Sequence, residues 1–269
     1  MVESFGEIVA ADLLAVRRAR PLIHSMTNFV VMNETANAIL AVGGSPVMSD
    51  AIDEVADFAA MAGAVVLNIG TLYPSSVEAM VVAGMAANRA GVPVVFDPVG
   101  AGATALRTDA ARRILDSVKV SMLRANQGEA MAVAGMGGEV RGVDSGRSVE
   151  GFARIASEIS ARIGCPVAVT GETDVITDSR TTWLCHNGHP MLQSVTGTGC
   201  TVTALTACFL AVTDDPLRGA TSALAFFALC GELAAAESRG PGSFEIALRD
   251  RIFNVGRDEL VAGVRVQKA

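Results

Sequence analysis

The sequence predicts an α/β fold in which a mostly parallel β-sheet lies between layers of helices. Short apolar runs alternate with helical patterns of ten or more residues, which is typical of crossover units that join parallel strands. The runs at 64–69 and 92–96 are almost continuously apolar, as expected for strands covered on both faces. No shift in composition marks a linker, so we predict a single domain over residues 1–269.

The elements follow one another in a regular order. Gly43 and Gly44 are a typical helix end, and Pro74 is typical of a helix start. Residues 174–185 interrupt the alternation and predict an antiparallel hairpin, because two β runs flank a polar turn. Beyond Thr196 the sequence is essentially all helical, and the glycine-rich segment 135–146 is predicted to be a surface loop. The expected strands are 20–28, 46–49, 64–70, 92–97, 119–124 and 166–171; the expected helices are 3–18, 33–43, 52–58, 74–91, 106–116, 127–135 and 148–163.

Composition bounds the class of protein. Apolar residues make up 51% of the chain and aromatic residues only 4%, which predicts a large aliphatic core. The net charge is −7, the pI is about 5.0 and no basic cluster is present, so nucleic acid is not an expected partner. Residues 1–14 lack a basic region and no apolar run reaches membrane-spanning length without glycines or charges, which argues against a secretory signal or membrane association. The five cysteines contain no C-x-x-C pair, so we expect a soluble, cytoplasmic protein without disulfides or zinc.

The segment Val195–Thr201 is the strongest local signal in the chain. Gly197 and Gly199 flank a threonine, and a long apolar helical run follows from Cys200. Glycine allows backbone to approach a ligand closely, and the free amides of a helix start favour an anion. The alternative is a tight turn capped by threonine in front of a buried helix.

Polar residues also follow the predicted strands, and the carboxyl ends of parallel strands form the ligand-binding edge of such sheets. Asp97 comes directly after four apolar residues, where an unpaired carboxylate is costly, so it is either a metal or active-site residue or a cap for the next loop. Asn126 and Glu129 have the spacing of a capping box, or else lie near a phosphate-bound Mg²⁺. Arg124 has the chemistry to bind a phosphate through two hydrogen bonds. The strand ends concerned are 68–70, 97–100, 124–126 and 170–172.

The histidines and Asn28 give weaker signals. His24 and Asn28 are interpreted as turn residues that satisfy backbone groups. His186 and His189 lie in a turn that contains Gly, Asn and Pro, and are expected to be exposed.

Taken together, five segments resemble the hydroxyethylthiazole kinase family, a thiamine-salvage branch of the ribokinase-like superfamily, over nearly the whole chain. The glycine loop that ends in cysteine is the most specific of them. The segments are Pro21–Asn28, Gly43–Met48, Asp97–Gly102, Asn126–Glu129 and Gly197–Cys200.

The resemblance implies a ribokinase-like three-layer sandwich and a phosphotransferase that acts on an alcohol group. The implied reaction converts ATP and 4-methyl-5-(2-hydroxyethyl)thiazole into the thiazole phosphate and ADP, with Mg²⁺. It also implies a homotrimer with active sites between subunits. By the same resemblance, Met48, Gly197, Asn28 and Val30 contact the thiazole; Arg124, Thr170 and Asn126 bind ATP; Asp97 and Glu129 hold the metal; and Thr198, Gly199 and Cys200 are catalytic.

The expected mechanism is in-line attack of the substrate hydroxyl on the γ-phosphate, with the amides of residues 198–201 as an anion hole. Many ribokinase-like enzymes carry an aspartate base where this chain has Cys200. A helix start lowers the pKa of a thiol, whereas the charge of ATP raises it. Because proton removal is late in a loose transition state, we expect Cys200 to orient the hydroxyl rather than to act as a strong base.

Three alternatives remain open at this stage. One is a kinase for another heterocyclic alcohol, such as hydroxymethylpyrimidine or pyridoxal, although Cys200 and the segment 24–28 argue against it. A second is an ATP-dependent dehydratase of the same fold that acts on hydrated nicotinamide nucleotides. A third is a non-catalytic nucleotide-binding regulator, which the many polar strand ends disfavour.

Overall fold

The computed structural model describes residues 4–136 and 149–269. Within these ranges a nine-stranded sheet forms the centre of the molecule, in the order β2-β1-β3-β4-β5-β6-β7-β8-β9. The first six strands are parallel: β1 (Leu22–Met26), β2 (Ser45–Val47), β3 (Ala64–Asn68), β4 (Val94–Asp97), β5 (Met122–Asn126) and β6 (Val167–Thr170).

The last three strands are antiparallel to their neighbours. The predicted hairpin is present as β7 (Asp174–Thr177) and β8 (Thr182–Cys185). The expectation that only helices follow Thr196 is wrong at the C-terminus, because Val266–Lys268 forms β9 on the edge of β8. This strand is too short to carry a recognisable pattern, and its pairing with β8 is a tertiary contact.

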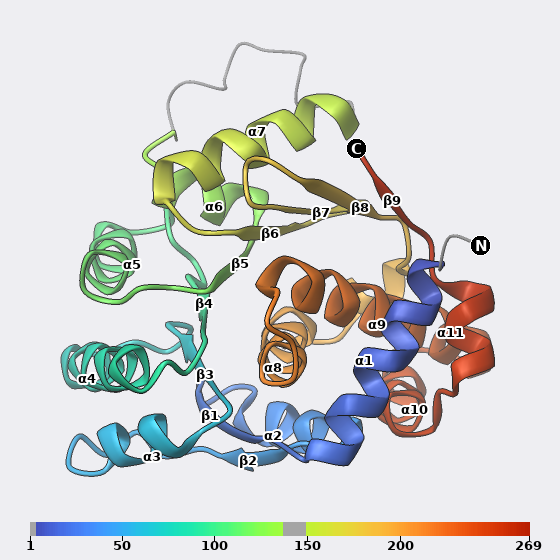
Figure 1. Cartoon of the computed structure of the whole chain (residues 1–269), viewed down its shortest axis with the longest axis horizontal. Helices are drawn as coiled ribbons and strands as arrows, with labels where there is room; N and C mark the ends of the chain where they lie inside the picture. Colours follow the sequence, from blue (N-terminus) through green and yellow to red (C-terminus); the bar gives the residue numbers. More distant parts are fainter. Residues whose placement is uncertain (1–3, 137–148) are drawn as a thin grey trace.

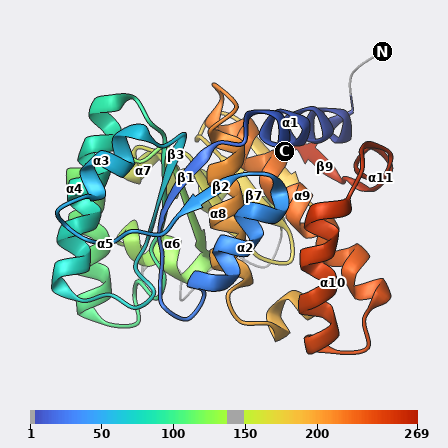
Figure 2. The same ribbon diagram turned by 90° about the horizontal axis from the view of Figure 1, so that it is seen from below.

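Helices cover both faces of the sheet, so the fold has three layers (Figures 1 and 2). One face is covered by α3 (Val55–Met61), α4 (Pro74–Ala90), α5 (Ala105–Ser117), α6 (Gln127–Val133) and α7 (Val149–Ile163). The other packs against α1 (Phe5–Ala19), α2 (Met32–Val42), α8 (Thr198–Leu210), α9 (Pro216–Glu237), α10 (Pro241–Asn254) and α11 (Arg257–Gly263), with the 3-10 helix η2 (Pro190–Ser194) before α8.

Two separate hydrophobic clusters explain the continuous apolar strands. Val65 and Val94 pack into one cluster, whereas their chain neighbours Val66 and Val95 pack into the other. Successive side chains of a strand point to opposite faces, so a strand buried on both faces must be apolar throughout. The mostly parallel sheet between two layers of helices is therefore confirmed.

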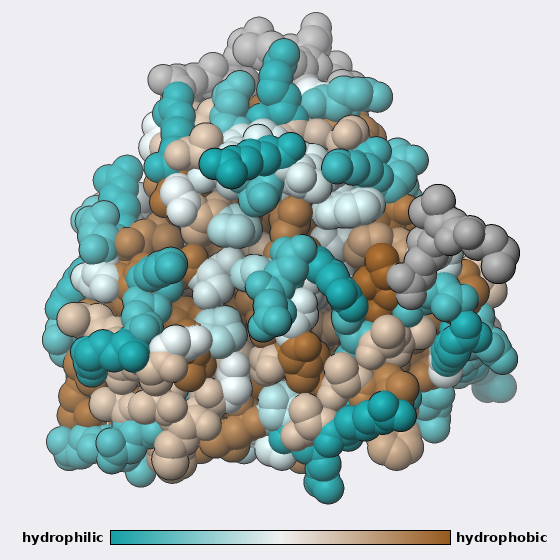
Figure 3. All heavy atoms as spheres, in the orientation of Figure 1, coloured by the Kyte–Doolittle hydropathy of each residue, from teal (hydrophilic) through white to brown (hydrophobic). Residues whose placement is uncertain are grey.

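The helix α9 is long and apolar enough to cross a membrane by composition, but 78% of its most apolar window is buried inside the protein. It packs against α8, and together they occupy the interior of one layer (Figure 1). On the face shown in Figure 3, hydrophilic residues are spread over the outer surface and hydrophobic residues form small patches between them. The length and hydropathy of α9 thus follow from its place in the core.

The predicted surface loop 135–146 falls almost entirely outside the described residues. Of its glycines, Gly135 is described and has a positive φ of 71°, which ends α6.

Candidate active site

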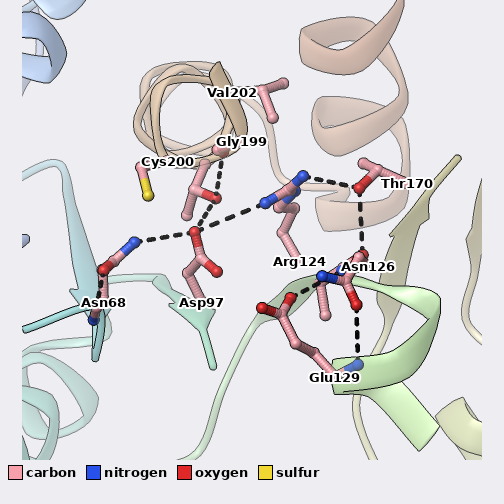
Figure 4. A network of polar contacts seen from close by, with 12 residues as sticks. Asn68, Asp97, Arg124, Asn126, Glu129, Thr170, Gly199, Cys200 and Val202 are labelled. Atoms are coloured by element: carbon pink, nitrogen blue, oxygen red, sulfur yellow. Dashed lines mark hydrogen bonds and ion pairs between the residues drawn. The ribbon is translucent and has the colours of Figure 1, made fainter. Parts of the chain in front are cut away.

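The strand ends converge on one edge of the sheet, as predicted. Asn68 of β3 lies beside Asp97 of β4, and Asn126 of β5 lies beside Thr170 of β6. The N-terminus of α8 faces the same edge, so that Gly199 and Cys200 lie above Asp97 and Arg124 (Figure 4). Helix start and strand ends together form the candidate site.

Asp97 is completely buried at the centre of this arrangement. Its Oδ2 accepts hydrogen bonds from Thr203 Oγ1 at 2.7 Å and Asn68 Nδ2 at 3.0 Å, while its Oδ1 has no partner in the described part of the chain. Burial raises the pKa of Asp97 to about 6, against the opposing effect of the nearby Arg124 guanidinium. An orphaned buried carboxylate oxygen is costly unless a cation or another donor reaches it, so the alternative of a simple loop cap does not explain Asp97.

Arg124 extends from β5 towards the helix start. Its Nη2 donates to Thr170 Oγ1 at 2.7 Å, and its Nη1 lies 3.8 Å from Asp97 Oδ2. A Cβ on Gly199 would come within 2.7 Å of Nη1, so the glycine leaves the space that the guanidinium occupies. Thr170 therefore orients Arg124, and Gly199 accommodates it.

Asn126 and Glu129 form the predicted capping box of α6. Asn126 Oδ1 accepts from Glu129 N at 2.9 Å, and Glu129 Oε2 accepts from Asn126 N at 3.0 Å. Glu129 Oε1 also accepts from Gly100 N at 2.7 Å, which ties the loop after β4 to α6. The structural interpretation of this motif is thus confirmed, and both side chains already have protein partners.

The donor set at Asp97 and Glu129 fits a magnesium ion that keeps most of its water. The Oδ1 of Asp97 is the oxygen that lacks a donor among the described residues, and Glu129 is near enough for its charge to raise the pKa of Asp97. Within the described residues no group of three acidic, histidine or cysteine side chains could enclose a metal. Mg²⁺ is commonly bound through one or two carboxylates plus phosphate oxygens, so this sparse set suits it.

The anion-binding prediction at α8 is refined by the helix geometry. Gly197 is the N-cap, with a positive φ of 85°. The amide of Thr201 donates to Gly197 O at 2.8 Å and is unavailable, so the predicted group 198–201 shrinks to residues 198–200. Among the described residues these three amides have no backbone or side-chain partner, as expected for the first turn of a helix.

Thr198 and Gly197 also have structural roles that the sequence analysis did not predict. Thr198 Oγ1 donates to Leu192 O at 2.9 Å, so its hydroxyl anchors η2 and only its amide faces the site. A Cβ on Gly197 would meet Val31 Cγ1 at 2.4 Å, so this glycine also permits close packing against the start of α2.

Cys200 is partly exposed, whereas the other four cysteines are buried. Its Sγ accepts from Asn28 Nδ2 at 3.3 Å. Burial and the Asp97 carboxylate raise the pKa of the Cys200 thiol, despite the helix start that was expected to lower it. A thiol with a raised pKa is a poor general base at neutral pH. Cys208, two turns further on, is fully buried in the core.

Of the residues expected to contact an acceptor, Asn28 is the one that bonds to Cys200. Interpreting Asn28 as a turn residue was incomplete, because its buried amide bridges Cys200 to Asn68 Oδ1, which it reaches at 3.0 Å. Val30 is 65% exposed and Met48 is half-buried. Neither residue, nor Asn28 or Gly197, lines the main cavity described next.

A cavity of about 670 Å³ opens beside the start of α8, which is within the usual size of a small-molecule site. Five of the predicted site residues line it, among them Arg124, Thr170 and Gly199. Polar residues form one wall, and apolar residues of α8 and α9 form another. The lining includes Arg124, Asn126, Thr170, Glu172, Asp174, Thr198, Gly199, Val202, Leu224, Phe227 and Ala228.

Sequence reasoning missed Thr203 and did not assign a role to Asn68. Thr203 is completely buried and donates to Asp97, and Asn68 connects Asp97 to Asn28 (Figure 4 labels Asn68). The available signal for Thr203 was a threonine one helical turn after Gly199, within the mostly apolar helical run that follows Cys200.

The expectations for the histidines were only partly right. His189 is exposed, as predicted, and accepts from Met191 N at 3.2 Å. His186 is half-buried and contacts Thr173 Oγ1 at 3.3 Å. His24 is not a turn residue: it lies in β1, completely buried.

Comparisons with known proteins agree on one family. The model of the hydroxyethylthiazole kinase family matches residues 13–258. The chain is 49% identical to the hydroxyethylthiazole kinase of Chloroflexus aurantiacus over 98% of each chain. The structure is similar to that of the same-named protein from Pyrococcus horikoshii, with a TM-score of 0.91 and 41% identity over 98% of this chain and 99% of the other. A ribokinase-like superfamily protein from Enterococcus faecalis shares the fold at a TM-score of 0.65 and 11% identity, over 95% and 96% of the chains. The chain belongs to the hydroxyethylthiazole kinase family.

Proposed function

We propose that this protein transfers the γ-phosphoryl group of ATP to the hydroxyl of 4-methyl-5-(2-hydroxyethyl)thiazole, as a step of thiamine salvage. The observation that carries the proposal is the juxtaposition at the start of α8. A cavity large enough for a nucleotide is lined by Arg124 and by Thr198 and Gly199, whose amides are free in the first turn of α8. Cys200 and its partner Asn28 lie next to this turn and outside the lining. The names of its relatives supply the identity of the acceptor alcohol.

In the proposed reaction the alcohol oxygen forms a bond to the γ-phosphorus while the bond to the β–γ bridging oxygen breaks. The products are the phosphate ester, ADP and the released hydroxyl proton. The amides of residues 198–200 and the Arg124 guanidinium stabilise the negative charge that spreads over the phosphoryl oxygens. Gly199 contributes both an amide and the space for Arg124.

Asp97 and Glu129 would hold Mg²⁺, which neutralises phosphate charge when it is bound. Thr203 and Asn68 fix one oxygen of Asp97, leaving the other towards the site. Asn126, which lines the cavity, shapes its edge mainly by capping α6.

Cys200 is proposed to orient the acceptor hydroxyl. Because Asn28 donates to Sγ, the sulfur acts as an acceptor there and the S–H is left for another partner. Replacement of Cys200 by Asp is expected to preserve or improve kcat, since a carboxylate can orient the hydroxyl and also accept its proton. Complete inactivity of a folded Cys200→Asp protein would refute this role; circular dichroism supplies the folding control.

The proposal includes a homotrimer in the cytoplasm, with each acceptor site between two subunits. Phe29 and Val30 are 61% and 65% exposed next to buried Asn28, and Phe29 stacks on Tyr73 at 6.2 Å. Exposed apolar side chains beside a site suit burial against a second copy. All five cysteines are unpaired, as expected in a reducing compartment.

The first test is a coupled assay of ADP release with Mg·ATP. It compares hydroxyethylthiazole, hydroxymethylpyrimidine, pyridoxal and no acceptor, with and without Mg²⁺. We expect release that depends on the thiazole and is lost without the metal. Release only with another alcohol would change the substrate, and free phosphate without a phosphorylated acceptor would indicate a hydrolytic or dehydratase reaction.

A further inference from the structure

The segment that carries Met48 has little support from the sheet. It follows β2, a three-residue strand that lies at the edge of the described sheet and pairs with β1. The pairing ends where His24 lies opposite Val47. Beyond the strand ladder, no backbone-to-backbone hydrogen bond of Met48, Ser49 or Asp50 is found in the described residues. Side chains must therefore hold this turn in place.

His24 provides the buried side-chain bond to this turn. Its Nε2 lies 2.8 Å from the carbonyl oxygen of Ser49, and its ring packs against Phe58 of α3 with 5.9 Å between ring centroids. Two further contacts lie at the surface: Ser49 Oγ bonds to Glu54, and Tyr73 Oη donates to Asp50 Oδ2 at 3.0 Å. Of these contacts, only the one from His24 comes from a completely buried side chain.

The bond also defines the protonation of the ring. A carbonyl oxygen only accepts, so Nε2 carries the hydrogen and the neutral ring leaves Nδ1 as an acceptor. Among residues 4–136 and 149–269, the buried Nδ1 has no partner. A hydrogen on this nitrogen would therefore be an unpaired buried donor, which is costly. Burial lowers the pKa of His24, in keeping with a neutral ring. The residue is thus a fixed donor to the turn, and its second nitrogen takes no part.

We propose that His24 is a positioning residue for the acceptor alcohol, which acts by holding Ser49 and thereby the preceding Met48 at the acceptor side of the site. This inference rests on the proposed function and on the family resemblance, which implies that Met48 contacts the thiazole; Met48 directly follows the carboxyl end of β2. His24 touches neither substrate. Its role is to fix the position of Met48 at the edge of the sheet.

The test uses two variants of His24 whose side-chain amide nitrogens lie at different distances from Cα. Glutamine places its Nε2 the same number of bonds from Cα as histidine does, whereas asparagine matches the position of Nδ1. We expect His24→Asn to raise the KM for the thiazole about ten-fold and His24→Gln to stay within about two-fold of the wild type, as the loss of one hydrogen bond predicts. The KM for ATP should be unchanged in both variants. Combined with Met48→Ala, His24→Asn should add little to the effect of Met48→Ala alone, because both act on one contact.

Equal effects of His24→Asn and His24→Gln on the thiazole KM, or parallel changes in both KM values, would overturn the inference in favour of a general structural role. If the wild type does not phosphorylate the thiazole, the proposed function fails and the inference falls with it.

If the variants do not fold, the inference is tested on the wild type instead. Saturating thiazole should slow solvent exchange of the His24 Nε2–H in ¹⁵N NMR, and an unchanged exchange rate would also overturn the inference.

Discussion

The candidate site has a proposed nucleotide side and a proposed acceptor side, and one chain forms the first more completely than the second. On the nucleotide side, Arg124, Thr170 and Gly199 line a cavity whose polar groups bond to one another. On the acceptor side, Met48 and Val30 lie outside this cavity, and Val30 is largely exposed. Asp97, fully buried between the sides, is linked to Arg124 on one and through Asn68 to Asn28 on the other.

This difference follows from the secondary-structure elements that supply the residues of each side. The nucleotide side uses central strands and a helix start, whose positions the sheet and core determine. The acceptor side uses an edge strand and the loop before α2. Changes on the nucleotide side should therefore act within one chain, whereas changes on the acceptor side should also depend on assembly.

The largest effect is expected at the residue that the two sides share. Asp97→Asn keeps the shape of the side chain but removes the charge beside the phosphates. We expect kcat to fall by about 10²–10³-fold, the size of effect seen when one electrostatic group of an active site is lost. Asp116→Asn, on the last turn of α5, is the surface control. Near-normal kcat in Asp97→Asn would remove Asp97 from the phosphoryl-transfer machinery.

On the nucleotide side, Arg124→Lys should lower kcat/KM for ATP by about 10²-fold, because a lysine cannot bond to Thr170 and a phosphate in the geometry of a guanidinium. The matched control is Arg113→Lys, whose partner Glu78 is at the surface. Steady-state kinetics with varied ATP measures the effect. A lysine variant as active as the wild type would mean that Arg124 contributes only charge.

On the acceptor side, Val30→Asp should disrupt assembly and raise the KM for the thiazole at least about ten-fold, since a buried charge at an interface is costly. ATP binding, followed by calorimetry, should change little. Leu106→Asp on α5 is a control at a similar exposure of 61%. Light scattering that shows an intact oligomer with normal thiazole kinetics would contradict the interface assignment.

A smaller effect is expected from crowding Arg124. Gly199→Ala would bring a Cβ to 2.7 Å from Nη1, so the guanidinium must shift; we expect the KM for ATP to rise about ten-fold through misplacement of this group. Gly242→Ala, where a Cβ meets nothing within 4 Å, is the control. Identical ATP kinetics of the two variants would show that Arg124 has freedom to move.

The last prediction concerns stability. The pKa of Asp97 is raised in the folded state to about 6, from an ordinary value of 3.8. The folded state therefore holds the proton more tightly, and the stability linked to this group is full below about pH 4 and is lost as the pH rises through about 6. Asp97→Asn should be more stable than the wild type at pH 8, on the order of 3 kcal/mol, and the difference should vanish below pH 4. Denaturant unfolding at both pH values measures it; a constant difference would exclude this titration.

Particular elements show what sequence reasoning reached. Apolar strands of the kind at 64–68 and 94–96 can only be buried on both faces, so the three-layer α/β fold followed from hydrophobic patterning alone. The capping box at Asn126 and Glu129 followed from local spacing. Strand β9 was missed, because the strand with which it pairs, β8, lies far away in the sequence.

The sequence by itself determined the fold class, the strand ends that gather at one edge and the glycine turn before α8, because these depend on local periodicity and on the geometry of parallel sheets. Only the tertiary structure decided which atoms remain open to a ligand. Thr201 loses its amide to the helix, Thr198 loses its hydroxyl to Leu192, and Asp97 keeps one oxygen free. These outcomes depend on hydrogen bonds between residues that packing brings together, and no local pattern encodes them.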